Sequence, residues 1–128
     1  MKHIFKALLL MLISFSAAAQ TKNVINADDF EKAVKEKGAQ ILDVRRPDEF
    51  KEGHLKGAIR ANWQDQKEFL EQVGHLDKKK PVYVYCLSGV RSGKAADWLS
   101  ENGFVQVTNL QGGIEAWKKA GKPLQSEN

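Results

Sequence analysis

The chain alternates short apolar segments with amphipathic ones, and this alternation restricts its fold more than any other feature. Extended apolar patterns occur at residues 24–26, 40–44, 58–61, 82–85 and 106–110. Helical patterns lie between them, from a cap at Asn26 to Gly38, over 65–73, over about 92–102 and between Gly113 and Gly121, with one further turn opened by Pro47. Strands separated by helices in this way form βαβ units. The sequence therefore predicts an α/β fold in which helices cover both faces of a central, mostly parallel five-stranded sheet.

The first residues have the order of parts of a secretory signal peptide. Lys2 and Lys6 precede an apolar run over residues 7–13, and Ala17-Ala18-Ala19 supplies the small residues of a cleavage site. The apolar run is too short to favour the alternative, an uncleaved membrane anchor. We expect cleavage after Ala19, which leaves residues 20–128 as a single domain. The expected location is the periplasm, with no stable membrane association after cleavage.

The net charge gives no indication of a nucleic-acid partner. The chain has 20 Lys and Arg and 16 Asp and Glu, a balance of +4. Removal of Lys2 and Lys6 with the signal leaves 18 minus 16, or +2. The basic balance is therefore partly a property of the signal segment and does not indicate a nucleic-acid surface.

Cys86 is the only cysteine of the 128 residues, so it cannot form an internal disulfide. A thiol-disulfide oxidoreductase would normally need a Cys-x-x-Cys pair, which the sequence lacks. A lone thiol in an oxidising compartment is open to oxidation and to unwanted pairing. Its presence indicates either a buried structural residue or a reactive one.

The surroundings of Cys86 favour the reactive interpretation. The residue follows the strand pattern 82–85 directly, and the segment 86–91, Cys-Leu-Ser-Gly-Val-Arg, leads into a helix. The carboxyl ends of parallel strands and the N-termini of helices are where unpaired N–H groups bind anions. Gly89 allows successive N–H groups to converge, and Arg91 adds a permanent positive charge. Such a setting lowers the pKa of a thiol and provides a nucleophile.

The segment CLSGVRS resembles the active-site loop of the rhodanese family, in which Cys-x-x-Gly-x-Arg precedes a small residue. Four further blocks are similar to family motifs in the same order along the chain. They are ILDVRRPDEFKEGHLKGAI at 41–59, PVYVYC, AADWLSENGF and LQGGIEAWKKAGKPL at 110–124. The resemblance covers essentially all of residues 20–128.

The resemblance implies a thiosulfate sulfurtransferase that works through a persulfide on Cys86. The backbone of the loop residues Leu87, Ser88, Gly89, Val90 and Arg91 would bind the anionic sulfur, with Arg91 positioning a small anionic donor. The acceptor would be cyanide or a thiol, and neither a metal nor an organic cofactor is implied. Family members place Asp43 and Arg45 near this loop. A supporting role and a buried structural pair are both open for these two residues, and the structural pair is favoured.

One departure from the family pattern concerns the donor. Many members carry a basic residue directly after the cysteine, where this chain has Leu87. This loss of charge makes a less charged donor, or a protein persulfide, an alternative to thiosulfate.

Two other functions are compatible with the same fold. One is a non-catalytic rhodanese-like binding or sulfur-carrier module, although such modules typically lack the cysteine that this chain retains. The other is a phosphatase or arsenate reductase, whose loop in the related phosphatases has five residues between cysteine and arginine. This chain has four, Leu87 to Val90, which favours the smaller sulfur site.

Overall fold

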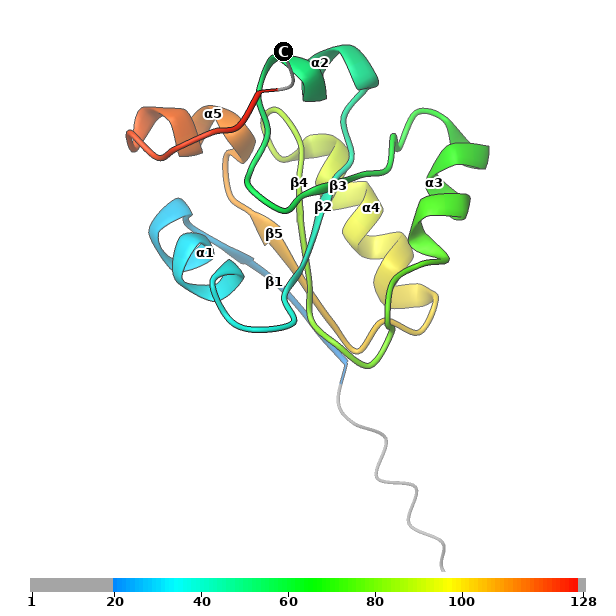
Figure 1. Cartoon of the computed structure of the whole chain (residues 1–128). Coiled ribbons are helices and arrows are strands. Elements are labelled where there is room, and N and C mark those ends of the chain that lie inside the picture. Colours follow the sequence, from blue (N-terminus) through cyan, green and yellow to red (C-terminus); the bar gives the residue numbers. More distant parts are fainter. Residues whose placement is uncertain (1–19, 127–128) are drawn as a thin grey trace, which may run out of the picture.

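Five parallel strands form one sheet at the centre of the molecule (Figure 1). The computed structural model describes residues 20–126. The strands are β1 (Thr21–Ile25), β2 (Gln40–Asp43), β3 (Ile59–Arg60), β4 (Val82–Tyr85) and β5 (Gln106–Leu110). Their order across the sheet is β1-β5-β4-β2-β3, and all four neighbouring pairs are parallel. The α/β fold predicted from the sequence is therefore confirmed, with a sheet that is parallel throughout.

Helices cover both faces of this sheet and enclose a separate hydrophobic core on each. The helices are α1 (Ala27–Val34), α2 (Pro47–Glu52), α3 (Gln66–Val73), α4 (Val90–Glu101) and α5 (Gly113–Lys119). One core lies under α1 and α5, where Phe30 makes edge-to-face contacts with Tyr83 and Trp117. The other lies under α3 and α4, where Phe69 makes similar contacts with Trp98. Helix α2 lies at the edge of the sheet where the strands end (Figure 1).

Strand β4 is the central element of both cores. Its four residues, Val-Tyr-Val-Tyr, are all buried, which is expected for a strand of a parallel sheet covered on both faces. Val82 and Val84 belong to the α3–α4 core, whereas Tyr83 and Tyr85 belong to the α1–α5 core. This alternation holds the end of β4, and the residue that follows it, in a fixed position.

Local capping explains where several helices begin. The Asn26 side chain accepts a hydrogen bond from the Asp29 N–H at 2.9 Å, as the sequence predicted for the start of α1. The Asp65 carboxylate accepts from the Glu68 N–H at 3.2 Å at the start of α3. Helix α4 begins at Val90, two residues before the predicted start, because Gly89 serves as its N-cap in a left-handed conformation.

The predicted signal peptide, residues 1–19, lies outside the described residues. Within residues 20–126, none of the helices has the length and apolar character needed to cross a membrane.

Candidate active site

Cys86 lies where the path of the chain through the sheet changes direction. After β2 the chain adds β3 on one side, then crosses to β4 on the other side of β2 and continues to β5. In open parallel sheets the crevice beside the carboxyl ends of the strands at such a reversal is the usual position of a binding site. Cys86 directly follows β4, and Arg45 follows the adjacent strand β2. The topology therefore brings the two sequence motifs to the same edge of the sheet.

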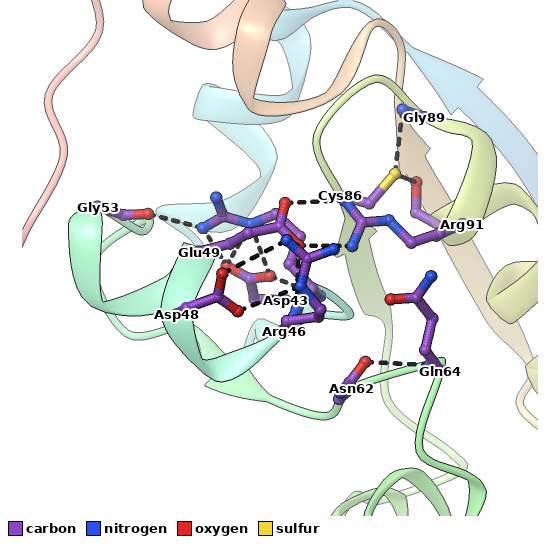
Figure 2. Close-up of polar contacts among 12 residues, drawn as sticks. Asp43, Arg46, Asp48, Glu49, Gly53, Asn62, Gln64, Cys86, Gly89 and Arg91 are labelled. Carbon is purple, nitrogen blue, oxygen red and sulfur yellow. Dashed lines mark hydrogen bonds and ion pairs between the residues drawn. The ribbon is translucent and has the colours of Figure 1, made fainter.

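The sulfur of Cys86 is buried and accepts hydrogen bonds from the turn that follows it. The residue is 1% exposed. Its Sγ accepts from the Gly89 N–H at 3.1 Å and from the Ser92 hydroxyl at 3.3 Å (Figure 2). Gly89 has φ of 104°, a left-handed conformation that turns its N–H back toward the sulfur. Both donors favour an ionised sulfur.

Two opposing effects act on the pKa of the Cys86 thiol. Burial raises this pKa and is the largest single effect. Hydrogen bonds from the Ser92 hydroxyl and from the backbone of Ser92, Gly89 and Ser88 lower it, and together they outweigh burial. The pKa therefore lies below the ordinary value of a cysteine, and a larger fraction of the thiol is ionised at neutral pH.

The loop keeps this shape because helix α5 binds its carbonyl groups. The Ile114 N–H donates to the Cys86 carbonyl at 2.9 Å, and the Glu115 N–H donates to the Leu87 carbonyl at 3.1 Å. The two chains approach so closely that a Cβ on Gly113 would lie 2.4 Å from the Leu87 oxygen. The second glycine of the Gly112-Gly113 turn is thus required for contact between α5 and the cysteine loop.

A side chain from β5 also holds the loop. The Asn109 amide donates to the Gly89 carbonyl at 3.3 Å, and the Gly93 N–H donates to the same oxygen at 3.0 Å. The residue whose N–H binds the sulfur is therefore fixed through its carbonyl as well.

The side chain of Arg91 reaches α2. Its guanidinium donates two hydrogen bonds to the Glu49 carboxylate, at 2.7 and 2.9 Å (Figure 2). Both side chains are mostly buried. Hydrogen bonding to Arg91 lowers the pKa of the Glu49 carboxyl although burial opposes it. Binding of an anionic donor by Arg91 would thus compete with Glu49, and this predicted role of Arg91 stays a prediction.

Asp43 and Arg45 form a buried pair at the end of β2. The Arg45 guanidinium donates to the Asp43 carboxylate at 2.7 Å and to the Gly53 carbonyl at 2.6 Å. Each residue is at most 3% exposed. The pair joins the end of β2 to the end of α2, which is the structural arrangement favoured from the sequence.

Leu87, Ser88 and Val90 form the exposed part of the loop. Leu87 is 38% exposed and Val90 is 64% exposed. The predicted loop residues therefore differ in what they contact. Gly89 contacts the sulfur, whereas the side chains of Leu87 and Val90 form an apolar rim on the surface.

Sequence reasoning missed several residues that shape the site. The sequence marks Ser92 only as the small residue that follows Arg91, but its place in the first turn of α4 brings its hydroxyl to the sulfur. Glu49 lies 42 residues before Arg91, and no local pattern pairs the two. The contact of Asn109 with Gly89 likewise depends on the neighbouring positions of β5 and β4.

No metal-binding cluster is present in residues 20–126, where no three His, Cys, Asp or Glu residues lie close enough together to hold an ion.

Comparison with known proteins places most of the described residues in one family. A family model described as the rhodanese-like domain matches residues 26–120. The chain is 34% identical over 115 residues to the uncharacterized protein YqhL of Bacillus subtilis, covering 89% of this chain and 87% of that protein. It is 40% identical over 85 residues to the thiosulfate sulfurtransferase GlpE of Coxiella burnetii, covering 66% of this chain and 77% of GlpE.

The same domain also occurs within longer proteins. The chain is 31% identical to the tRNA uridine(34) hydroxylase of Pelagibacter ubique over 91% of its own length, but it spans only 38% of that protein. Among solved structures, a rhodanese-related protein from Thermoplasma volcanium superimposes with a TM-score of 0.71 at 30% identity, over 82% of this chain and 99% of that one.

Replacement of Gly113 by alanine tests the contact between α5 and the loop. We expect Gly113→Ala to lower the stability, because the new Cβ would meet the Leu87 carbonyl and displace the loop. Displacement of the loop weakens the backbone hydrogen bonds that lower the pKa of Cys86, so alkylation by iodoacetamide at neutral pH should be slower. Gly121→Ala is the matched control, since Gly121 also has a positive φ but has open space around it. The stability of Gly121→Ala should fall only by about 1–2 kcal/mol, the cost of a left-handed conformation for a residue with a side chain. Equal melting temperatures and alkylation rates for the two variants would contradict the role of this contact.

Replacement of Ser92 by alanine tests its hydrogen bond to the sulfur. Loss of the hydroxyl removes an effect that lowers the pKa of Cys86, so the rise of alkylation rate with pH should move to higher pH. At neutral pH the rate should fall about tenfold, because hydrogen bonds to charged groups contribute about 1.5–3 kcal/mol. Ser100→Ala, in the same helix, is the control and should leave the profile in place. If the alkylation rate of Ser92→Ala depends on pH as in the wild type, the Ser92 hydroxyl does not lower the pKa of Cys86.

Proposed function

The chain belongs to the rhodanese-like domain family, and we propose that it is a sulfurtransferase that moves a sulfane sulfur through a persulfide on Cys86. The observation that carries the proposal is the pair of hydrogen bonds from the Gly89 N–H and the Ser92 hydroxyl to the Cys86 sulfur. These donors stabilise a negative charge on sulfur at the N-terminus of α4, first on the thiolate and then on the persulfide. The relationship to proteins named thiosulfate sulfurtransferase supports the same chemistry.

The reaction proceeds in two nucleophilic steps. The Cys86 thiolate attacks the outer sulfur of the donor, and the bond between the two donor sulfurs breaks with its electron pair on the leaving group. With thiosulfate the leaving group is sulfite, and the enzyme becomes Cys86–S–S⁻. A thiophilic acceptor, cyanide or a thiol, then attacks the terminal sulfur and releases the Cys86 thiolate. Charge and electrons balance in both steps without an oxidant or a reductant.

The loop stabilises the intermediate through its backbone. The N–H groups of Val90 and Arg91 lie in the first turn of α4, where no carbonyl of the same helix accepts them. They are thus suited to receive the terminal sulfur, which extends the site by one atom beyond Sγ. Because Sγ is already hydrogen-bonded in the free enzyme, no separate general base is needed to form the nucleophile.

Mass spectrometry of the intact protein tests the persulfide. Incubation of residues 20–128 with a sulfane sulfur donor should add the mass of one sulfur atom, and cyanide should remove it and yield thiocyanate. Cys86→Ser is the control and should stay at its starting mass.

The outcomes of this experiment separate the functions. A sulfur adduct that neither cyanide nor any thiol removes would favour a sulfur-carrier module. The absence of an adduct with every sulfane donor would contradict the proposed function and favour a binding module.

We also propose that the protein acts in the periplasm after removal of residues 1–19, free of a membrane anchor. The basic start, the short apolar run and the small residues before Gln20 support this location.

Expression of the full chain in a bacterium with a periplasm tests the location. The soluble periplasmic fraction should contain a protein whose first residue is Gln20. A variant lacking residues 2–19 should stay in the cytoplasm. Recovery of the full chain in the membrane pellet, or in the cytoplasm with its original N-terminus, would contradict export.

A further inference from the structure

The arginine of the cysteine loop is already neutralised by a carboxylate from another element. Arg91 and Glu49 are joined by two parallel hydrogen bonds, and their side chains are 18% and 14% exposed. Paired, partly buried groups of this geometry are among the strongest ion pairs in proteins. The positive charge of Arg91 is therefore offset before any donor arrives.

The neighbouring arginines also have carboxylate partners, Arg45 in the interior and Arg46 at the surface. Arg45 binds Asp43 in the interior, and Arg46 lies 3.2 Å from Asp48 and 3.7 Å from Glu49. Figure 2 shows these charged groups close together beside Cys86, in two sets that we call the network: Asp43 with Arg45, and Glu49 with Arg46, Arg91 and, through Arg46, Asp48. The network has three guanidinium groups and three carboxylates, so its net charge is zero.

The network lies within electrostatic range of the sulfur. The pKa of Arg91 is raised first by its hydrogen bonds to Glu49, and also by Coulombic attraction to the charge of Cys86. A change in the charge of this network would consequently change the electrostatic potential at the thiolate and at any anion bound next to it.

The exposed rim of the loop adds a second, independent observation. Leu87 and Val90 present apolar side chains to solvent on either side of Gly89. Next to an apolar rim a dianion loses hydration free energy that the rim does not replace. An apolar substituent, in contrast, is stabilised when it packs against these side chains.

We propose that this site selects sulfane sulfur donors with an apolar substituent and a single negative charge, such as organic thiosulfonates, over the thiosulfate dianion. In this proposal, which rests on the sulfurtransferase function above, Glu49 determines the selectivity by offsetting the charge of Arg91. Cys86–S⁻ attacks the outer sulfur of R–SO₂–S⁻, the S–S bond of the donor breaks, and the sulfinate R–SO₂⁻ leaves with the electron pair. One negative charge remains on the persulfide, so atoms, charge and electrons balance.

Glu49 acts through Arg91 and is a positioning residue. It is also held by its own helix, because its carboxylate accepts from the Arg46 N–H at 3.3 Å. Replacement of Glu49 by glutamine keeps a hydrogen-bond acceptor for Arg91 but removes the charge. The Arg91 charge then becomes available to an anion, and a dianion gains more from it than a monoanion does.

A pair of donors of similar size tests the proposal. The methanethiosulfonate anion differs from thiosulfate by a methyl group in place of one oxygen, and it carries one negative charge less. With cyanide as acceptor, thiocyanate formation gives kcat and KM for each donor. Sulfite and sulfinate differ as leaving groups, so the change in the kcat/KM ratio between variants is the decisive quantity.

We expect Glu49→Gln to shift the kcat/KM ratio toward thiosulfate by about tenfold, equivalent to about 1.4 kcal/mol. The shift should come mainly from a lower KM for thiosulfate, because the charge acts on binding of the donor. Glu52→Gln is the matched control, since it removes the same charge from an exposed position of α2. The control should leave the ratio unchanged.

A second variant provides another measurement of how local charge affects the donor ratio if Glu49→Gln folds poorly. Leu87→Arg adds a cation at an exposed position without touching the Arg91–Glu49 pair, and it should shift the ratio in the same direction. The inference is overturned if folded Glu49→Gln keeps the wild-type donor ratio, if Glu52→Gln shifts it equally, or if Leu87→Arg, where Glu49→Gln does not fold, leaves it unchanged. Failure of these two donors and of every other sulfane donor to load Cys86 would instead overturn the proposed sulfurtransferase function.

Discussion

The chemistry of this protein depends on two backbone hydrogen bonds between helix α5 and the cysteine loop. The N–H groups of Ile114 and Glu115 bind the carbonyls of Cys86 and Leu87. In a trans peptide the C=O and the following N–H point in opposite directions. When α5 binds these carbonyls, the N–H groups of Leu87 and Ser88 turn away from it and into the loop, and the backbone of Ser88 is one of the groups that lower the pKa of Cys86. The absence of a side chain on Gly113 makes this contact possible, because the Leu87 oxygen would lie 2.4 Å from a Cβ there. The closing motif of the chain thus contributes to the environment of a cysteine more than twenty residues before it.

The second constraint is the neutralisation of every arginine in the network beside the sulfur. Asp43 and Arg45 are buried and would be costly to leave unpaired, so they form a stable joint between β2 and α2. Glu49 and Arg91 form a similar joint between α2 and α4. As a result the thiolate receives its stabilisation from neutral donors, the Gly89 N–H and the Ser92 hydroxyl, rather than from a free cation. This difference between a dipolar site and a cationic site underlies the donor selectivity proposed above.

Much of the fold could be predicted from sequence because its signals are local. Asn26 caps α1 as its side chain predicts, and the Val82–Tyr85 pattern is the central buried strand. The start of α4 was predicted two residues too late. A glycine usually indicates a loop, but Gly89 is the N-cap here because its left-handed conformation directs the chain straight into the helix. The place of the Cys86 loop, between the end of a strand and the start of a helix, was also predictable, because both patterns are visible along the chain.

The sequence by itself determined the order of strands and helices, the position of the single thiol at a strand end, and the glycines that allow the tight turns around it. These properties depend on residues within a few positions of one another, which the periodicity and the turn residues reveal. Only the tertiary structure decided which groups the sulfur and Arg91 meet. The Glu49–Arg91 pair, the Asn109–Gly89 contact and the approach of Gly113 to Leu87 join residues from different elements. Such contacts arise from the crossover order of the sheet and the packing of helices on its two faces, and no local pattern encodes them.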